Sequence, residues 1–157
     1  DGDKRSATGC VATAAVQIMN YHQWPEKAVG KGQYRMGEEN VNETVFPVDL
    51  SGYTFDWKNM LDVYDSTSTA VQDKAVAELM YAVGVAGNML YSAAGSGTMD
   101  EYMAKGLIEN LNYDKNLLCL HRDYYMTAGW KRLLKVELAA KRPVLYEWWA
   151  CLCLRWL

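Results

Sequence analysis

The sequence predicts an α+β fold, with amphipathic helices separated by short strands. Two segments, 11–22 and 69–83, have the apolar spacing of helices that bury one face. Between them, residues 26–58 are rich in Gly, Asn, Thr and Tyr and have no helical period, which favours short strands and turns. The chain has 157 residues, half of them apolar, and can therefore bury a sizeable core.

The first helix is expected over residues 11–22. Val11, Ala15 and Ile18 fall on one helical face, and the neighbouring alanines favour helix by intrinsic propensity. Pro25 prevents any continuation beyond the residue before it. In the region that follows, strands are expected in the alternating segments KGQY and DLSGYTFDW.

The second helix, over 69–83, has the clearest apolar stripe, and Gly84 is expected to end it. The stripe consists of Val71, Ala75, Val76, Leu79, Met80 and Val83. The next residues, GNMLYSAAGSGT, predict a short apolar strand and then a loop of small residues.

Two further helices and a strand are expected in the C-terminal half. Thr98 and Glu101 have the spacing of a capping box, which predicts a third helix that runs to about Leu111. A fourth helix is expected to begin at Thr127 and to end at KRPVLY, where a strand at 144–146 follows. Its inward-facing residues are expected to be Trp130, Leu133, Leu134 and Leu138.

The composition changes after Tyr146, where the chain reads EWWACLCLRWL. A buried terminal strand is one interpretation, but the segment has no turn residue to form a hairpin. We therefore divide the chain into a domain at 1–146 and an atypical tail at 147–157, whose composition would suit an out-of-frame end.

Charge and composition exclude several classes of function. The net charge is −3 and no basic stripe is present, so no nucleic-acid partner is expected. No apolar run approaches the ~20 residues that span a bilayer, and no membrane partner is expected. The four cysteines and two histidines lack the paired spacing of zinc ligands, so we expect neither a metal nor a cofactor.

Cys10 follows Gly9 at the predicted start of the first helix. A helix N-terminus carries partial positive charge and unpaired N–H groups, which favour a thiolate and can stabilise an oxyanion. Gly9 leaves room for a peptide to approach the sulfur. This arrangement suits nucleophilic acyl transfer, although a small buried cysteine before a helix is the alternative.

The segment ATGCVATAAVQIMNYHQWP resembles the sequence around the nucleophile of the streptopain-like cysteine peptidases, a bacterial family of the papain-like clan. The segments YTFDWKNML, AVAELMYAVGVAGNMLYSAAGSGT and WKRLLKVELAAKRPVLY are similar to later parts of that family. The resemblance runs from about Ala7 to Tyr146. It implies a truncated papain-like fold that comprises the helical half and the first strands of the sheet.

The resemblance also implies roles for individual residues and for the whole protein. Cys10 matches the catalytic nucleophile, and Gly95 and Ser96 match a loop that contacts the substrate backbone. The implied activity is endopeptidase cleavage of a peptide or protein substrate. Membership would further imply an inhibitory pro-domain in the full-length form and a secreted or cell-surface location.

A cysteine peptidase also needs an imidazole as its general base. In an unbroken helix, His22 would lie about 18 Å from Cys10, too far for proton transfer. His121 does not match the family's catalytic position and could serve only as a surrogate base. The family's histidine follows the PVLY strand in a segment that this sequence lacks. We therefore expect an inactive chain, with a non-catalytic peptide- or pro-segment-binding module as the alternative.

Overall fold

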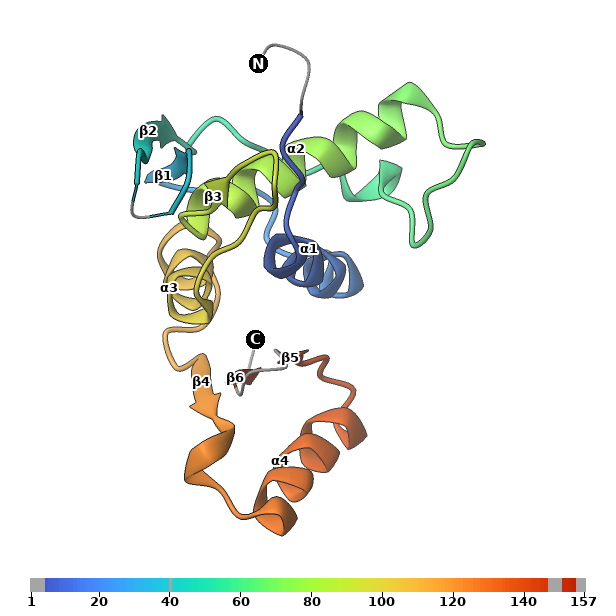
Figure 1. The fold of residues 1–157 in the computed structure, drawn as a ribbon. Helices are drawn as coiled ribbons and strands as arrows, with labels where there is room; N and C mark the ends of the chain where they lie inside the picture. Colours follow the sequence, from blue (N-terminus) through green and yellow to red (C-terminus); the bar gives the residue numbers. More distant parts are fainter. Residues whose placement is uncertain (1–4, 40, 147–150, 155–157) are drawn as a thin grey trace.

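The computed structural model describes residues 5–39, 41–146 and 151–154, and its mixed helices and strands confirm the predicted α+β class (Figure 1). The helices are α1 (Cys10–His22), α2 (Ala70–Ala86), α3 (Asp100–Asn110) and α4 (Thr127–Ala139), with 3-10 turns at Trp57–Asn59 and Arg122–Tyr124. The strands are β1 (Lys31–Met36), β2 (Thr44–Asp49), β3 (Leu90–Tyr91), β4 (Leu118–His121), β5 (Leu145–Tyr146) and β6 (Cys151–Leu154).

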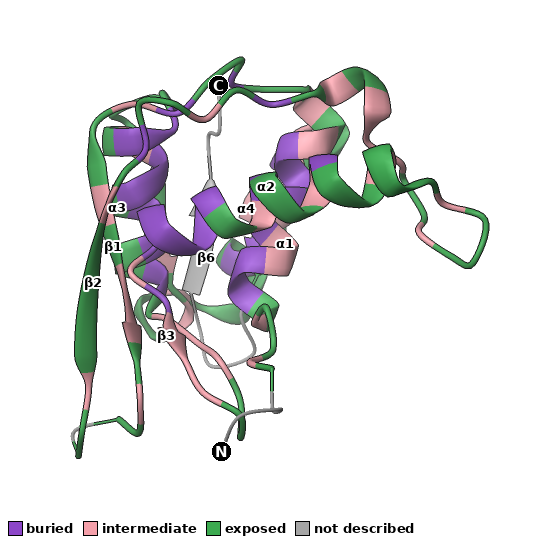
Figure 2. Cartoon of the chain, turned by 90° about the horizontal axis from the view of Figure 1, so that it is seen from above, coloured by how far each residue is buried: buried purple, intermediate pink, exposed green. Residues whose placement is uncertain are grey.

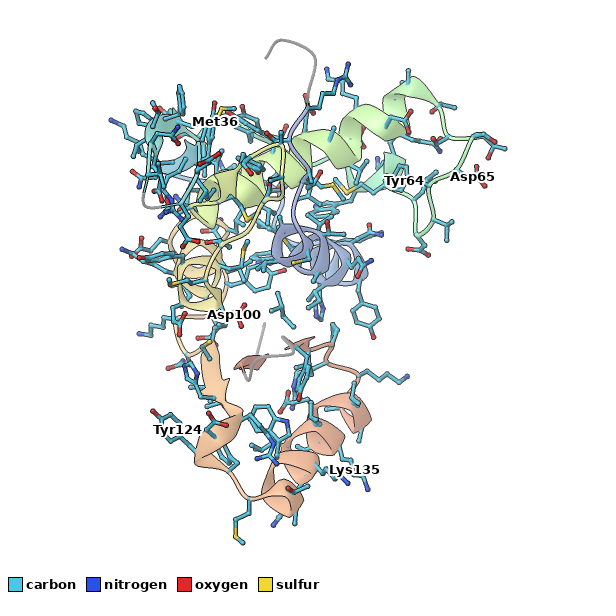
Figure 3. All side chains as sticks on the ribbon, viewed as in Figure 1. Met36, Tyr64, Asp65, Asp100, Tyr124 and Lys135 are labelled. Atoms are coloured by element: carbon cyan, nitrogen blue, oxygen red, sulfur yellow. The ribbon has the colours of Figure 1, made fainter. Side chains whose placement is uncertain are left out.

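The described strands form two small sheets. In the first, β1 lies between β2, with which it pairs antiparallel, and β3, with which it pairs parallel. In the second, β6 lies between β4 and β5 and is antiparallel to both. The second sheet and α4 lie below α1 and α3 in Figure 1, and Tyr124 and Lys135 mark this C-terminal part in Figure 3.

The main core lies where α1, α2 and α3 meet, and Figure 2 shows buried residues on all three helices. Met19, Leu79 and Leu107 are completely buried there. Small residues allow the helices to approach closely, since a Cβ at Gly106 would overlap the Ala86 carbonyl of α2. Each large apolar side chain buried in this way contributes roughly 1.5–3 kcal/mol to stability.

The second helix extends further than the sequence indicated. Thr69 caps its start by accepting a hydrogen bond from the Gln72 backbone, and the Gln72 side chain accepts one from the Thr69 N–H at 2.8 Å. The expected stop at Gly84 is wrong, because α2 continues to Ala86 and is capped at Gly87. Gly84 has a packing role instead, since a Cβ there would overlap the Tyr91 hydroxyl.

The capping box predicted for the third helix is also wrong. The N-cap of α3 is Met99, whose side chain makes no capping hydrogen bond. The Thr98 hydroxyl instead donates to the Gly87 carbonyl at 2.6 Å, while Glu101 approaches His121 at 3.3 Å. Tertiary partners have therefore replaced the local pairing of these two side chains.

The strand predictions for residues 26–58 are partly confirmed. KGQY forms the first four residues of β1, but most of DLSGYTFDW lies in a turn at 51–52 and in irregular segments. Asp49 ends β2 by accepting a hydrogen bond from the Ser51 N–H at 2.9 Å, which reverses the chain. In the rest of this segment, residues 50–57, Thr54 alone has strand-like pairing, through a single bridge to Lys27.

The C-terminal part has its own small core around Trp130, which is 3% exposed. Leu133 and Leu134 pack against it, but Leu138 is 62% exposed, so its predicted inward orientation is wrong. Within the proposed tail, residues 151–154 form strand β6. The absence of a turn residue in the sequence had argued against a strand here. The rest of the tail lies outside the described residues.

No described helix combines the length and the apolar character required to cross a bilayer.

Candidate active site around Cys10

Cys10 is the first residue of α1, and its free thiol is exposed. The alternative of a buried cysteine is therefore wrong. Gly9 caps the helix through its backbone, and the Gly9 carbonyl accepts hydrogen bonds from the Thr13 N–H at 3.1 Å and the Thr13 hydroxyl at 2.8 Å. No side-chain cap occupies the first-turn N–H groups among the described residues, which leaves these donors directed towards the space in front of the helix.

Gly9 brings Cys10 next to the loop that contains Gly95 and Ser96. Gly9 has φ +92°, and a Cβ placed on it would lie 2.9 Å from the Ser96 carbonyl oxygen and would overlap the Met89 side chain. The loop backbone therefore packs against the residue that precedes the thiol. Ser96 is half-buried, whereas Gly95 is exposed and has open space around it.

The loop from Ser92 to Gly97 is held in shape by its own hydrogen bonds. Leu90 and Gly97 exchange two backbone hydrogen bonds, at 2.9 and 3.1 Å, which close its base. The Ser92 hydroxyl donates to the Gly95 carbonyl at 2.8 Å and accepts from the Ala94 N–H at 3.2 Å. Sequence reasoning missed this role of Ser92, although a serine that opens a small-residue loop is a signal for such a turn.

Two hollows flank this loop. The first, here called the Ser96 cavity, has a volume of about 790 Å³. The second, of about 610 Å³, reaches Ser6 in the segment that leads to Cys10. The Ser96 cavity is lined by Arg35, Gly37, Glu38, Glu39, Leu90, Ser92, Ala94, Gly95, Ser96, Gly97, Thr98, Met99 and Tyr102. Asp100, labelled in Figure 3, is the first residue of α3 and lies between the lining residues Met99 and Tyr102 in the sequence.

The two histidines, His22 and His121, both lie away from Cys10. His22 is the last residue of the unbroken helix α1, about 18 Å from Cys10 by helical rise. Its Nε2 is buried without a hydrogen-bond partner, and burial lowers the pKa of the imidazole. His121 lies on β4, where its Nε2 is 3.3 Å from Glu101 of α3 and its ring meets the edge of Tyr124. Neither imidazole is paired with Cys10.

The described residues contain no group of three or more His, Cys, Asp or Glu side chains that could hold a metal ion. The polar groups next to Cys10 are instead the backbone N–H groups of the first turn of α1 and, beside Gly9, the backbone of Ser96. Such groups can orient a peptide and stabilise negative charge on an acyl oxygen.

The sequence profile of the Peptidase C10 family matches residues 1–151 of this chain. The chain is 33% identical over 143 residues to the thiol protease/hemagglutinin PrtT of Porphyromonas gingivalis, a match that covers 91% of this chain and 16% of PrtT. It is 30% identical over 148 residues to streptopain of Streptococcus pyogenes, covering 92% of this chain and 37% of streptopain. The chain thus spans only about a sixth of the length of PrtT and about a third of the length of streptopain.

Two solved structures have a similar fold. The active wild-type interpain A cysteine protease of Prevotella intermedia superimposes with a TM-score of 0.80 and 32% identity, over 89% of this chain and 57% of interpain A. A fragment of prointerpain A from the same organism superimposes with a TM-score of 0.82 and 30% identity, over 92% of this chain and 46% of the fragment. The partial papain-like fold implied by the sequence resemblance is therefore confirmed.

Proposed function

Because this chain belongs to the Peptidase C10 family, we propose that it carries the nucleophile half of a cysteine-type endopeptidase, with Cys10 as the catalytic nucleophile. The observation that carries the proposal is the exposed free thiol at the start of α1, packed beside the loop of Gly95 and Ser96. Residues 1–146 form the catalytic portion in this proposal, and 147–157 contribute no catalytic group.

The proposed reaction begins when the Cys10 thiolate attacks the carbonyl carbon of the scissile peptide bond. Negative charge develops on the carbonyl oxygen, where first-turn N–H groups of α1 can donate hydrogen bonds to it. The carbon–nitrogen bond then breaks, and the leaving amine takes a proton from an imidazole. Water hydrolyses the resulting thioester and restores the thiol.

The imidazole is the part of this reaction that we do not assign to His22 or His121. His22 is at the opposite end of α1, and His121 is paired with Glu101. The chain spans only 37% of streptopain and 57% of interpain A, so we propose that the base belongs to a part of the full protein outside these residues. The 157-residue chain should then bind peptides and react with electrophiles, but should not turn over a substrate.

Gly95 and Ser96 are proposed to bind the substrate backbone. An exposed glycine with open space around it allows an extended peptide to lie against the loop, and the hydrogen bonds of Ser92 keep the loop in place. The same surface would receive an inhibitory pro-domain in the full-length form, a proposal supported by the likeness to a pro-form of interpain A. Export to the cell surface or medium is part of the same proposal.

Alkylation of Cys10 tests this function without requiring turnover. A short peptidyl chloromethyl ketone and chloroacetone, which carries the same electrophile without the peptide, should be compared on the folded chain and on the chain unfolded in guanidinium chloride, with peptide mapping by mass spectrometry. The peptide reagent should have an advantage of at least about tenfold in the folded chain, because binding beside Ser96 holds its electrophile near the sulfur. This advantage should disappear on unfolding.

Cys10→Ser is the control for the site of labelling, and it should abolish the accelerated reaction. Equal rates for the two reagents on the folded chain would contradict the proposed nucleophile. Peptide binding without accelerated alkylation would favour the non-catalytic binding module instead. Steady casein hydrolysis that Cys10→Ala abolishes would show that the chain already contains a working base.

A further inference from the structure

The Ser96 cavity is joined to the nucleophile through one residue. Ser96 lines the cavity, and its carbonyl oxygen packs directly against Gly9, the residue before Cys10. A peptide whose scissile bond lies at Cys10 and whose backbone follows the loop would therefore place a nearby side chain at this cavity. Its volume of about 790 Å³ is large enough for any amino-acid side chain.

The cavity wall formed by the β1–β2 loop is fixed relative to the loop of Ser96. The Gly37 N–H donates to the Tyr91 carbonyl at 3.2 Å, which links the end of β1 to the end of β3. The Glu38 N–H donates to the Asn42 side chain at 2.8 Å. Gly37 has φ +128°, and a Cβ there would lie 2.5 Å from the Asn42 carbonyl oxygen, so a tight turn positions Glu38.

The charge of the cavity is negative. Three charged side chains line it, namely Arg35, Glu38 and Glu39. Arg35 is already neutralised by Glu43, with 2.9 Å between Nη1 and Oε2, and its Nη2 donates to the Asn88 carbonyl at 3.3 Å. Within the described part of the chain, neither Glu38 nor Glu39 has an ion-pair partner, and both are exposed.

The cavity lining also contains apolar side chains. They include Leu90, Met99 and Tyr102, and the last two are substantially exposed. Such side chains can cover the methylene groups of an arginine or lysine side chain while the cationic head reaches a carboxylate. The tyrosine ring adds a favourable face for a guanidinium group.

We propose that the Ser96 cavity is a subsite for a basic side chain of the peptide substrate, and that Glu38 and Glu39 determine this specificity. The inference rests on the proposed function only in identifying the ligand as a peptide that also reaches Cys10. It concerns peptide recognition and does not require the missing imidazole.

Equilibrium binding tests this inference separately from the chemistry of Cys10. Fluorescein-labelled alanine-based hexapeptides that carry one arginine, scanned through the positions, should be compared with identical peptides that carry neutral citrulline. Fluorescence anisotropy on the Cys10→Ser chain should give about three- to tenfold tighter binding for arginine at one or two positions, as expected for two partly exposed charge contacts. Raising the salt to about 0.5 M should reduce this ratio.

Glu38→Gln/Glu39→Gln should bring the ratio of the two affinities to about one. Glu26→Gln, which neutralises an exposed carboxylate that does not line the cavity, is the matched control and should leave the ratio unchanged. Equal affinities in the parent chain, no measurable binding of either peptide, or a ratio that survives the double substitution would overturn the inference. Because Cys10 is replaced throughout, these outcomes are independent of the alkylation test of the proposed function.

Discussion

Gly9→Ala is the most direct perturbation of the contact between the thiol segment and the loop of Ser96. The substitution adds one methyl group at a position where φ is +92° and ψ is 143°, a backbone conformation that L side chains rarely adopt. The new Cβ would lie 2.9 Å from the Ser96 carbonyl oxygen and would overlap the Met89 side chain. Met89 is completely buried, so its side chain has little room to move.

The magnitude follows from two contributions. Holding a residue with a side chain in a backbone region populated mainly by glycine costs about 1–3 kcal/mol. Forcing an extra methyl group into a packed site costs a further ~1–3 kcal/mol. We therefore expect Gly9→Ala to lower the free energy of unfolding by about 2–6 kcal/mol, or to displace the loop and relieve part of this cost.

Urea denaturation followed by circular dichroism measures the first outcome, and the rate of alkylation of Cys10 by a peptidyl chloromethyl ketone measures the second. Gly97→Ala is the matched control on the other side of the contact, in the loop of Ser96, because Gly97 has an ordinary φ and open space around it. It should change stability by less than about 1 kcal/mol. A Gly9→Ala protein with the stability and the alkylation rate of the parent chain would refute the packing argument.

Three further substitutions test other parts of the structure. Thr69→Ala removes the capping box of α2 and should lower the free energy of unfolding in urea by about 1 kcal/mol, while the rate of alkylation of Cys10 stays unchanged. An unchanged free energy of unfolding would show that the cap is dispensable. Asn110→Ala removes a buried side-chain amide that donates to the backbone carbonyls of Val29 and Lys31. It should lower the free energy of unfolding by about 1–3 kcal/mol, measured in the same way, and an unchanged stability would contradict the role of these hydrogen bonds. For His22, burial lowers the pKa in the folded chain below the ordinary 6.5, so the unfolded chain binds the proton more readily. Stability should therefore fall as the pH drops from about 7 to 5, and His22→Gln should make this fall shallower in melts recorded across that range; an identical fall would exclude the contribution of His22.

The parts of the fold that the sequence predicted are those set by local periodicity. Helix α1 was expected at 11–22 and begins at Cys10, because its apolar spacing and alanine content agree with its burial. The predicted end of the second helix at Gly84 was wrong, because Gly84 lies within α2 and its missing side chain makes room for the Tyr91 hydroxyl. The capping box expected at Thr98 failed for a similar reason, because the Thr98 hydroxyl donates to the Gly87 carbonyl, eleven residues earlier and outside the third helix.

The candidate site was predictable in its residue types but not in its geometry. The position of Cys10 at a helix start could be read from the local pattern, and the resemblance indicated Gly95 and Ser96. The contact between Ser96 and Gly9 joins segments more than eighty residues apart, so no local pattern contains it. The same is true of Glu38 and Glu39, which reach the cavity because β1 pairs with β3.

The separate packing around Trp130 has a consequence for limited proteolysis. The turn that leads into α4 contains Tyr124, which is 83% exposed, whereas α1 lies within the main core. A protease that cleaves after aromatic residues should therefore nick the chain at this turn first. The amino-terminal product would retain the three core helices, the thiol and the adjoining loop as one durable piece.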